Sequence, residues 1–261
     1  MARTSAQADT QANAIQKPLN GLELFQANNE SGFIPGFDDI SAEDIKMPRI
    51  KLCQPTSKEV GDEKCKAGEF YNITTGDTYP ELNVRLLSVS KGRTMWPEQF
   101  KRGDSPICRS NNGRVSTDGK SCSTCENCKW SGNERPLCNQ TYTWLGLLDD
   151  DAPFRMSASG AAISNVKTFI TECTRHNVPP FTFKVKIVAE KQTNDKGTYY
   201  TPKYEIQKTE NGAYVLPTKE QWNAFKETME GLKSMFQRAV EADLMINADD
   251  TEVIDAEGEL F

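Results

Sequence analysis

Apolar and polar residues alternate with a period of two over seven stretches of the chain, which predicts a mainly β protein. The clearest stretches are residues 82–96 and 181–189. The predicted strands are residues 47–53, 69–73, 82–96, 141–149, 153–159, 181–189 and 198–206. The run of three aspartates that begins at Asp149 has turn character, so the strands on either side of it are expected to form an antiparallel hairpin.

Two further stretches have the i, i+3, i+4 spacing of amphipathic helices. Residues 161–174 place Val166, Phe169 and Cys173 on one face, and a C-terminal helix is expected from Lys219 to about Asp243 with Thr218 as its N-cap. An OB-fold-like antiparallel barrel fits this order, with the first helix between its third and fourth main strands.

Composition divides the chain into four parts. Hydrophobic residues make up only 37% and the mean hydropathy is −0.63, which indicates that a sizeable fraction of the chain is unpacked. We expect a flexible acidic leader (1–45), an OB-like domain (46–216) with an insertion at about 97–140, a C-terminal helix (217–243) and a disordered acidic tail (244–261). No long apolar run predicts a membrane span, and the N-terminus does not resemble a secretory signal, so a cytoplasmic location is expected.

The formal net charge of −6 argues, for the chain as a whole, against binding to a polyanion. The charge is unevenly distributed, however. Residues 46–240 contain 29 Lys or Arg and 22 Asp or Glu, a net charge of +7, whereas both ends are acidic. The body of the protein is therefore basic and remains compatible with a nucleic-acid partner.

Five cysteines lie within 31 residues: Cys108, Cys122, Cys125, Cys128 and Cys138. A C-x2-C pair presents two thiolates that suit one edge of a Zn²⁺ tetrahedron, and the surrounding Gly, Asn and Ser residues have almost no apolar core of their own. One structural Zn²⁺ bound by Cys108, Cys122, Cys125 and Cys138 is expected, and the alternative set replaces Cys122 with Cys128. A disulfide cluster is the less favoured interpretation.

Two features argue against an enzyme. A site of four thiolates has no open coordination position for catalysis, and the only histidine, His176, follows a predicted helix in a polar stretch. The remaining cysteines stand apart from the cluster, and Cys53 and Cys173 fit ordinary buried core positions.

Aromatic and basic residues are interleaved along the predicted strands, a pattern typical of proteins that bind single-stranded nucleic acid by base stacking and phosphate contacts. The candidate nucleic-acid-binding residues are Lys91, Arg93, Trp96, Lys101, Arg102, Tyr142, Trp144, Arg155, Lys184, Lys186, Tyr199, Tyr200, Lys203 and Tyr204. The tail is acidic and ends in Leu-Phe, a composition suited to partner binding or to competition with nucleic acid. Its candidate partner-binding residues are Asp249, Asp250, Asp255, Glu257, Glu259, Leu260 and Phe261.

The order of these motifs resembles the zinc-containing single-stranded DNA-binding proteins of tailed bacteriophages. The resemblance covers about residues 47–261 and depends on Cys108, on Cys122-x2-Cys125-x4-Trp130, on Cys138 before an aromatic strand, and on the acidic tail that ends in Phe261. It implies an OB-type core that coats single strands in replication or recombination in the host cytoplasm, and a tail that recruits replication or recombination proteins. It also favours Cys122 over Cys128 as a zinc ligand.

Two other classes of function remain open at the level of sequence. One is a zinc-containing accessory transcription or recombination factor that acts mainly through protein–protein contacts. The other is a Mg²⁺-dependent nuclease, which is disfavoured because no second carboxylate cluster on a strand accompanies the aspartates at 149–151.

Overall fold

The computed structural model describes residues 46–99, 105–132, 134–195 and 197–243. The predicted leader, the predicted tail with its partner-binding residues, Lys101 and Arg102 lie outside the described residues. All described residues belong to a single unit, Asp39–Phe261. No helix in the described part of the chain is long and apolar enough to cross a membrane.

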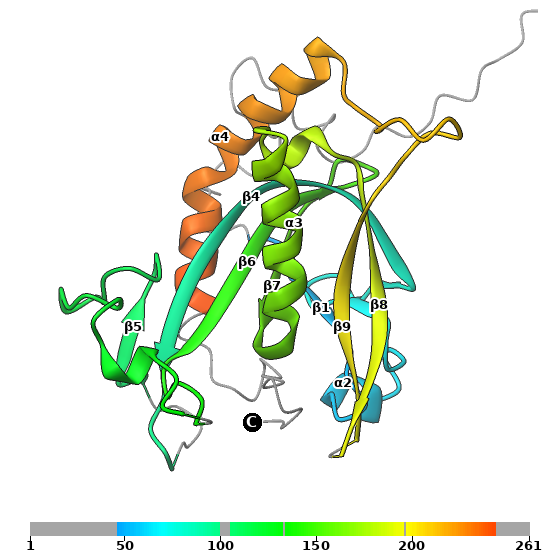
Figure 1. Cartoon of the computed structure of the whole chain (residues 1–261). Coiled ribbons are helices and arrows are strands. Elements are labelled where there is room, and N and C mark those ends of the chain that lie inside the picture. Colours follow the sequence, from blue (N-terminus) through cyan, green and yellow to red (C-terminus); the bar gives the residue numbers. More distant parts are fainter. Residues whose placement is uncertain (1–45, 100–104, 133, 196, 244–261) are drawn as a thin grey trace, which may run out of the picture. The chain divides into compact units, whose positions relative to one another are not determined.

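The described elements are mainly strands, in the order predicted from the hydrophobic pattern (Figure 1). The strands are β1 (Ile50–Leu52), β2 (Phe70–Asn72), β3 (Thr78–Tyr79), β4 (Glu81–Met95), β5 (Cys108–Ser110), β6 (Asn139–Leu148), β7 (Pro153–Ser159), β8 (Val185–Asn194) and β9 (Gly197–Ile206). The α-helices are α2 (Lys58–Gly61), α3 (Ile163–Arg175) and α4 (Lys219–Asp243), and the short 3₁₀ turns are η1 (Glu126–Cys128), η2 (Gly160–Ala162) and η3 (Pro180–Thr182).

The larger sheet is antiparallel, with the strand order β7-β6-β4-β8-β9, and β5 pairs with the end of β4. The 15-residue β4 is its central strand, pairing with β8 near its start and with β6 over most of its length. A bulge between Leu86 and Ser88 shifts the alternation, so that Leu86 and Val89 contact the same core although they are three residues apart. β1, β2 and β3 form a separate three-stranded antiparallel sheet.

Two apolar clusters stabilise the larger sheet, each with its own helix. The first contains the buried face of α3, where Val166, Phe169 and Cys173 pack with Trp144 and other strand residues. The second contains Phe236 and Val240 of α4 together with strand residues such as Leu87 and Leu145. Since successive strand residues point to opposite faces, the two helices cover opposite faces of the sheet.

Both predicted helices are confirmed, and α4 begins with a reciprocal capping box. The Gln221 amide N–H donates to Thr218 Oγ1 at 3.2 Å, and the Thr218 N–H donates to Gln221 Oε1 at 3.0 Å. The hairpin across the aspartate turn is also confirmed by the pairing of β6 with β7.

The prediction of an OB-type barrel is wrong in one respect, because the described sheet is not closed. Its edge strands β7 and β9 do not pair with each other. Residues on either side of β1 contact these two edges instead. Arg49 forms an isolated parallel bridge with Arg155 of β7, and the Gln54 side chain hydrogen-bonds to the backbone of Tyr200 of β9. Isolated bonds of this kind cover the edges but do not form the continuous ladder that a barrel requires.

One cysteine prediction also needs correction. Cys173 is buried in the core, as predicted, but Cys53 is not a free core residue because it forms a disulfide with Cys65. The hydrophobic alternation around Cys53 predicted its burial, but it contained no information on a partner 12 residues away.

Candidate nucleic-acid interface

The five clustered cysteines lie in residues 108–138, here called the cysteine-rich segment. This segment is anchored where β4 ends and β6 begins. On the outgoing side, the Ile107 N–H donates to the Met95 carbonyl at 2.8 Å, which starts the pairing of β5 with β4. On the returning side, the Cys138 N–H donates to the Asn127 carbonyl at 2.8 Å. Short turns rather than an apolar core shape the rest of the segment, as its composition predicts.

The five thiols of this segment are close enough to influence one another. Burial, then the charges of Asp118, Cys122 and Cys125, raise the pKa of Cys108. Burial also raises the pKa of Cys128, which hydrogen-bonds with Cys138 and Cys125.

The most buried of these thiols is Cys138. Burial, followed by the charge of Cys128, raises its pKa to about 12, and Cys108 contributes in the same direction. Cys108, Cys125, Cys128 and Cys138 therefore form a closed ring of interacting thiols, in which each interacts with two others.

The thiols are not arranged as a finished coordination site. Within the described ranges, no group of three or more His, Cys, Asp or Glu side chains is positioned to hold a metal ion. The donor set nevertheless has the right chemistry for zinc, because several clustered cysteines in a segment with little apolar core are the composition of structural zinc sites, in which the metal binds the thiolate forms.

Arg93 connects the cysteine-rich segment to the sheet. From β4, its guanidinium donates to the carbonyl oxygens of Cys128 and Cys138, both at 3.4 Å, and to Gln140 Oε1 at 3.0 Å. The Arg93 side chain thus contacts both the η1 turn of the segment and the residues that lead into β6.

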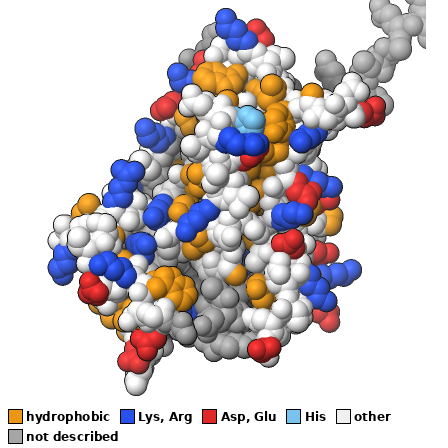
Figure 2. Space-filling view, viewed as in Figure 1, with side chains coloured by type: hydrophobic (Ala, Val, Ile, Leu, Met, Phe, Trp, Pro, Cys, Tyr) orange, Lys and Arg blue, Asp and Glu red, His pale blue; other side chains and the backbone are white. Residues whose placement is uncertain are grey.

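A groove of about 1190 Å³ lies between the cysteine-rich segment and the beginning of α3. Its charged lining residues are four cations and two acids: Arg93, Lys129, Arg135, Lys167, Glu126 and Glu134. Glu126 pairs with Lys129 at 3.2 Å. Figure 2 shows Lys and Arg side chains gathered on the face between the cysteine-rich segment and α3.

Positive charge is concentrated next to this groove. Burial is the main cause that lowers the pKa of Lys91, followed by repulsion from Arg93 and Lys167, with Arg114 contributing in the same direction. The η2 turn that precedes α3 has no side-chain hydrogen bond at its N-cap, and the first turn of α3 contains no acid. The positive end of the helix dipole is thus not neutralised locally.

Two large apolar side chains of the groove are open to solvent. Trp130 is 56% exposed and Leu137 is 68% exposed, and both line the groove beside the cations. An exposed tryptophan in a groove whose lining cations outnumber its acids can stack on a base while the cations contact phosphates.

The structure separates the sequence-predicted binding residues into several groups. Arg93 lines the groove, Lys91 lies two residues before it on β4, and Trp96 directly follows the end of β4. Trp144 is 0% exposed and lies in the core, so we do not retain it as a stacking residue. Tyr142 is half-buried against the same core.

Four of the predicted cations have structural partners. Lys184 pairs with Asp149 at 2.8 Å, Lys186 with Glu81 at 2.7 Å, and Lys203 with Glu205 at 3.0 Å. The Arg155 guanidinium donates to the Met47 carbonyl, and the Arg155 N–H donates to the Pro48 carbonyl at 2.8 Å.

The tyrosines of β9 lie outside the groove. Tyr199, Tyr200 and Tyr204 are all half-buried, and the Tyr204 hydroxyl accepts a hydrogen bond from Trp144 Nε1 at 3.2 Å. The groove also contains cations and exposed apolar side chains that the sequence pattern did not predict as binding residues: Lys129, Trp130, Arg135, Leu137 and Lys167. The available signal was Lys-Trp directly after Cys128, but no sequence pattern linked it to Lys167 of α3.

These features define a class of protein: a mainly antiparallel β protein with two covering helices and a cysteine-rich segment beside a basic groove. Residues 19–236 match the family described as Pam3 phage gp34-like protein, so the chain belongs to that family and is a phage protein. No curated protein and no solved structure matches the chain.

Proposed function

We propose that this phage protein binds single-stranded DNA in the groove between the cysteine-rich segment and α3. The observation that carries the proposal is the presence of an exposed tryptophan, Trp130, in a groove whose lining cations outnumber its acids. The charge of the body, +7 over residues 46–240, supports it.

Each group in the groove has a distinct role in this proposal. Arg93 and Lys167 contact phosphates, and Lys91 adds to the positive potential that attracts them. Trp130 stacks on an unpaired base. A duplex does not offer such a base, so the groove prefers single strands, and its binding depends little on base sequence because every base can stack. No catalytic step is assigned to the protein.

We also propose that one Zn²⁺ shapes this groove through Cys108, Cys125, Cys128 and Cys138. The side-chain hydrogen bonds that join Cys128 to Cys138 and to Cys125 favour Cys128 over Cys122 as the fourth ligand. When bound, the metal supplies a structural cross-link with no open coordination position. Cys128 and Cys138 themselves line the groove, and Arg93 bonds to the carbonyl oxygens of both, so the metal site and the groove share residues.

The wider role is part of the same proposal and rests on the chemistry of the chain, while the family match adds only that this is a phage protein. Coating of single strands during phage replication or recombination takes place in the host cytoplasm, and the acidic tail recruits replication or recombination proteins. The exposed Leu137 favours a second candidate, an accessory transcription or recombination factor whose groove binds a protein. The two candidates differ in whether the purified chain binds DNA.

Binding of a fluorescent oligo(dT) strand, measured by anisotropy at 50 and 200 mM salt, tests the proposed function. Trp130→Ala is expected to weaken binding by about 1–3 kcal/mol through the lost stacking. Lys167→Ala is expected to weaken it and to reduce the salt slope by about 1 because one phosphate contact is lost.

Lys226→Ala is the matched control, since Lys226 is an exposed lysine on α4 that does not line the groove. Equal losses from Lys167→Ala and Lys226→Ala would place the DNA elsewhere. If the unaltered chain does not bind oligo(dT) but binds a protein through Trp130, the accessory-factor candidate would be favoured.

The zinc proposal has its own test in metal analysis of the purified chain. About one zinc per chain is expected, because one ring of four thiolates binds one ion. Serine at Cys108, Cys125, Cys128 or Cys138 is expected to abolish stoichiometric zinc, whereas Cys122→Ser, the matched control, retains it. Loss of zinc in Cys122→Ser with retention in Cys128→Ser would support the other ligand set, and a zinc-free unaltered chain would refute the site.

A further inference from the structure

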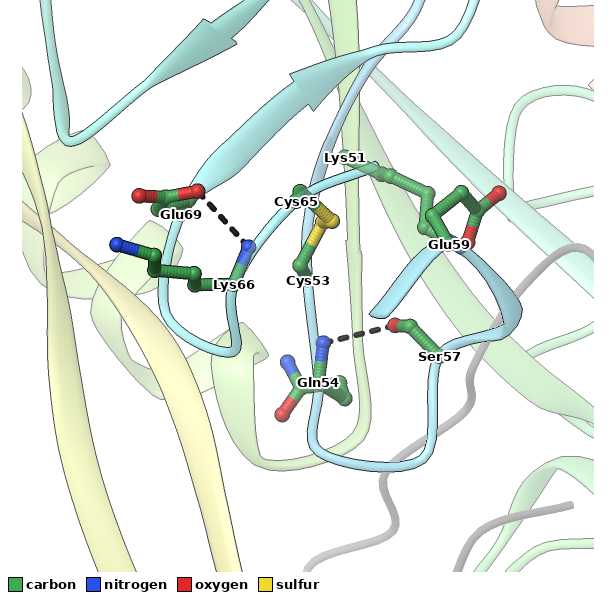
Figure 3. The surroundings of a disulfide bond; sticks show 8 residues. All are labelled: Lys51, Cys53, Gln54, Ser57, Glu59, Cys65, Lys66 and Glu69. Carbon is green, nitrogen blue, oxygen red and sulfur yellow. Dashed lines mark hydrogen bonds and ion pairs between the residues drawn. A yellow bond between two sulfur atoms is a disulfide. The ribbon is translucent and has the colours of Figure 1, made fainter. Parts of the chain in front are cut away.

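A disulfide-closed loop lies against the edge strand β9, outside the proposed groove. Cys53 and Cys65 are bonded across 12 residues, and both are buried (Figure 3). The loop between them contains the short helix α2 and connects β1 to β2. The bond thus closes a small lobe at the side of the larger sheet.

Residues at both ends of this loop contact Tyr200 of β9. The buried Gln54 side chain pairs with both backbone groups of Tyr200: it accepts from the N–H at 2.8 Å and donates to the carbonyl at 2.9 Å. Gly68 lies under the Tyr200 ring, where a Cβ atom would come within 2.8 Å of the ring. Among the described strands β9 pairs only with β8, so these contacts cover its outer edge.

The position of Gln54 depends on the closed loop. Its N–H donates to Ser57 Oγ at 2.8 Å (Figure 3). The neighbouring Cys53 donates its N–H to the Glu69 carbonyl and accepts from the Gly68 N–H, both at 2.8 Å. The apolar cluster inside the lobe is small and consists of the two bonded cysteines, Tyr71 and Val60. In so small a cluster the covalent bond contributes much of the local order.

We propose that the Cys53–Cys65 disulfide is a redox-sensitive latch. When it is oxidised, the loop holds Gln54 against Tyr200 and covers the edge of β9. When it is reduced, the loop opens and exposes the backbone N–H and carbonyl of Tyr200, an edge to which another strand can add. Lys58 and residues 61–64 are exposed, so local opening of this loop admits a reductant.

The chemistry requires a dithiol reductant. One thiolate of the dithiol attacks a sulfur of the disulfide, which breaks the S–S bond and forms a mixed disulfide with one cysteine. The second thiol of the dithiol then displaces that cysteine. The products are two protein thiols and one oxidised dithiol, a transfer of two electrons and two protons.

Hydrogen exchange of the full chain, with and without a dithiol such as dithiothreitol, tests the latch. Alkylation of individual peptides reports the state of Cys53 and Cys65. Reduction is expected to speed exchange in residues 54–64 and at Tyr200 by at least about tenfold, because opening is no longer restrained by the cross-link. Exchange in the paired residues of β4 and β6 is expected to stay unchanged.

Gln54→Leu tests the latch without touching the disulfide. In the oxidised chain it is expected to speed exchange at Tyr200, whereas the matched control Gln192→Leu is not, since Gln192 bonds to Glu190 on its own strand. Reduced cysteines with unchanged exchange at Tyr200 would overturn the proposal. Cysteines that are already free in the oxidised protein, or a disulfide that resists the dithiol in the folded chain, would also overturn it.

Discussion

At the scale of single residues, two tryptophans only 14 positions apart have opposite environments. Trp144 is fully buried, packs edge-on against Phe169 and donates its Nε1–H to Tyr204. Trp130 lies in the cysteine-rich segment and is 56% exposed. Burial of the indole N–H in the first case is tolerated because it has a partner, and exposure in the second leaves a surface for a ligand.

The partner of Trp144 gives a prediction for the pH dependence of stability. Burial raises the pKa of Tyr204 above its ordinary value of 10.0. The unfolded chain therefore loses this phenolic proton near pH 10 while the folded chain retains it, so the free energy of unfolding falls as the pH rises above 10. Tyr204→Phe is expected to remove this part of the alkaline loss.

Urea unfolding between pH 8 and pH 11 measures the effect. Tyr199→Phe is the matched control on the same strand, and its stability is expected to follow that of the unaltered chain. If Tyr204→Phe and the unaltered chain lost stability in parallel above pH 10, the assignment to Tyr204 would be wrong.

At the scale of elements, close packing between neighbouring strands decides which residues fit. Gly146 on β6 faces the Phe154 ring of β7, and a Cβ atom at this position would lie 2.6 Å from the ring and 3.2 Å from the Arg85 carbonyl oxygen. Phe154 is itself fully buried in the first core, so it has little freedom to move away.

Gly146→Ala is therefore expected to destabilise the protein by about 1–3 kcal/mol through overpacking. Gly231→Ala on α4 is the control, because a Cβ atom there meets nothing within 4 Å. That change is expected to stabilise the protein by up to about 1 kcal/mol, since alanine favours the helix. Chemical denaturation measures the change in the free energy of unfolding of each variant. An unchanged free energy of unfolding in Gly146→Ala would contradict the close packing.

At the scale of the whole molecule, the distribution of charge matters more than its sum. The net charge of −6 combines a body of +7 with acidic ends, and within the body the cations gather beside the cysteine-rich segment. The described chain reaches that region again at the end of α4, where Asn111 Nδ2 donates to Glu241 at 2.9 Å.

Removal of residues 244–261 is expected to strengthen DNA binding and to weaken partner binding. The deletion removes six acids and no base, which changes the formal net charge from −6 to 0. The gain in DNA affinity is expected to be larger at 50 mM than at 200 mM salt, because the higher salt concentration screens electrostatic interactions more strongly. Anisotropy titrations of both chains measure it.

A tail of the same length with its acids changed to Asn and Gln separates charge from length. It is expected to bind DNA like the truncated chain. Loss of DNA affinity on truncation would show that the tail contributes to binding and does not compete with it.

Much of the fold could be predicted from local patterns. The alternation in residues 82–96 predicted β4, and Thr218 marked the start of α4. The alternation in residues 181–189 predicted β8 but placed its start too early, because Pro180–Thr182 form the η3 turn and β8 begins at Val185. The barrel could not be predicted correctly, because closure depends on whether β7 and β9 meet. That depends on long-range pairing, about which the alternation within each strand contains no information.

The candidate site shows the same division. The Gly, Asn and Ser content of residues 108–138 by itself determined that this segment has almost no apolar core, since that property belongs to local composition. Only the tertiary structure decided that Trp130 and Lys167 share a groove, that Trp144 is buried and that Cys53 bonds to Cys65. The physical reason is distance along the chain: hydrophobic periodicity records which side of an element faces the core, whereas a site is made by elements that only folding brings together.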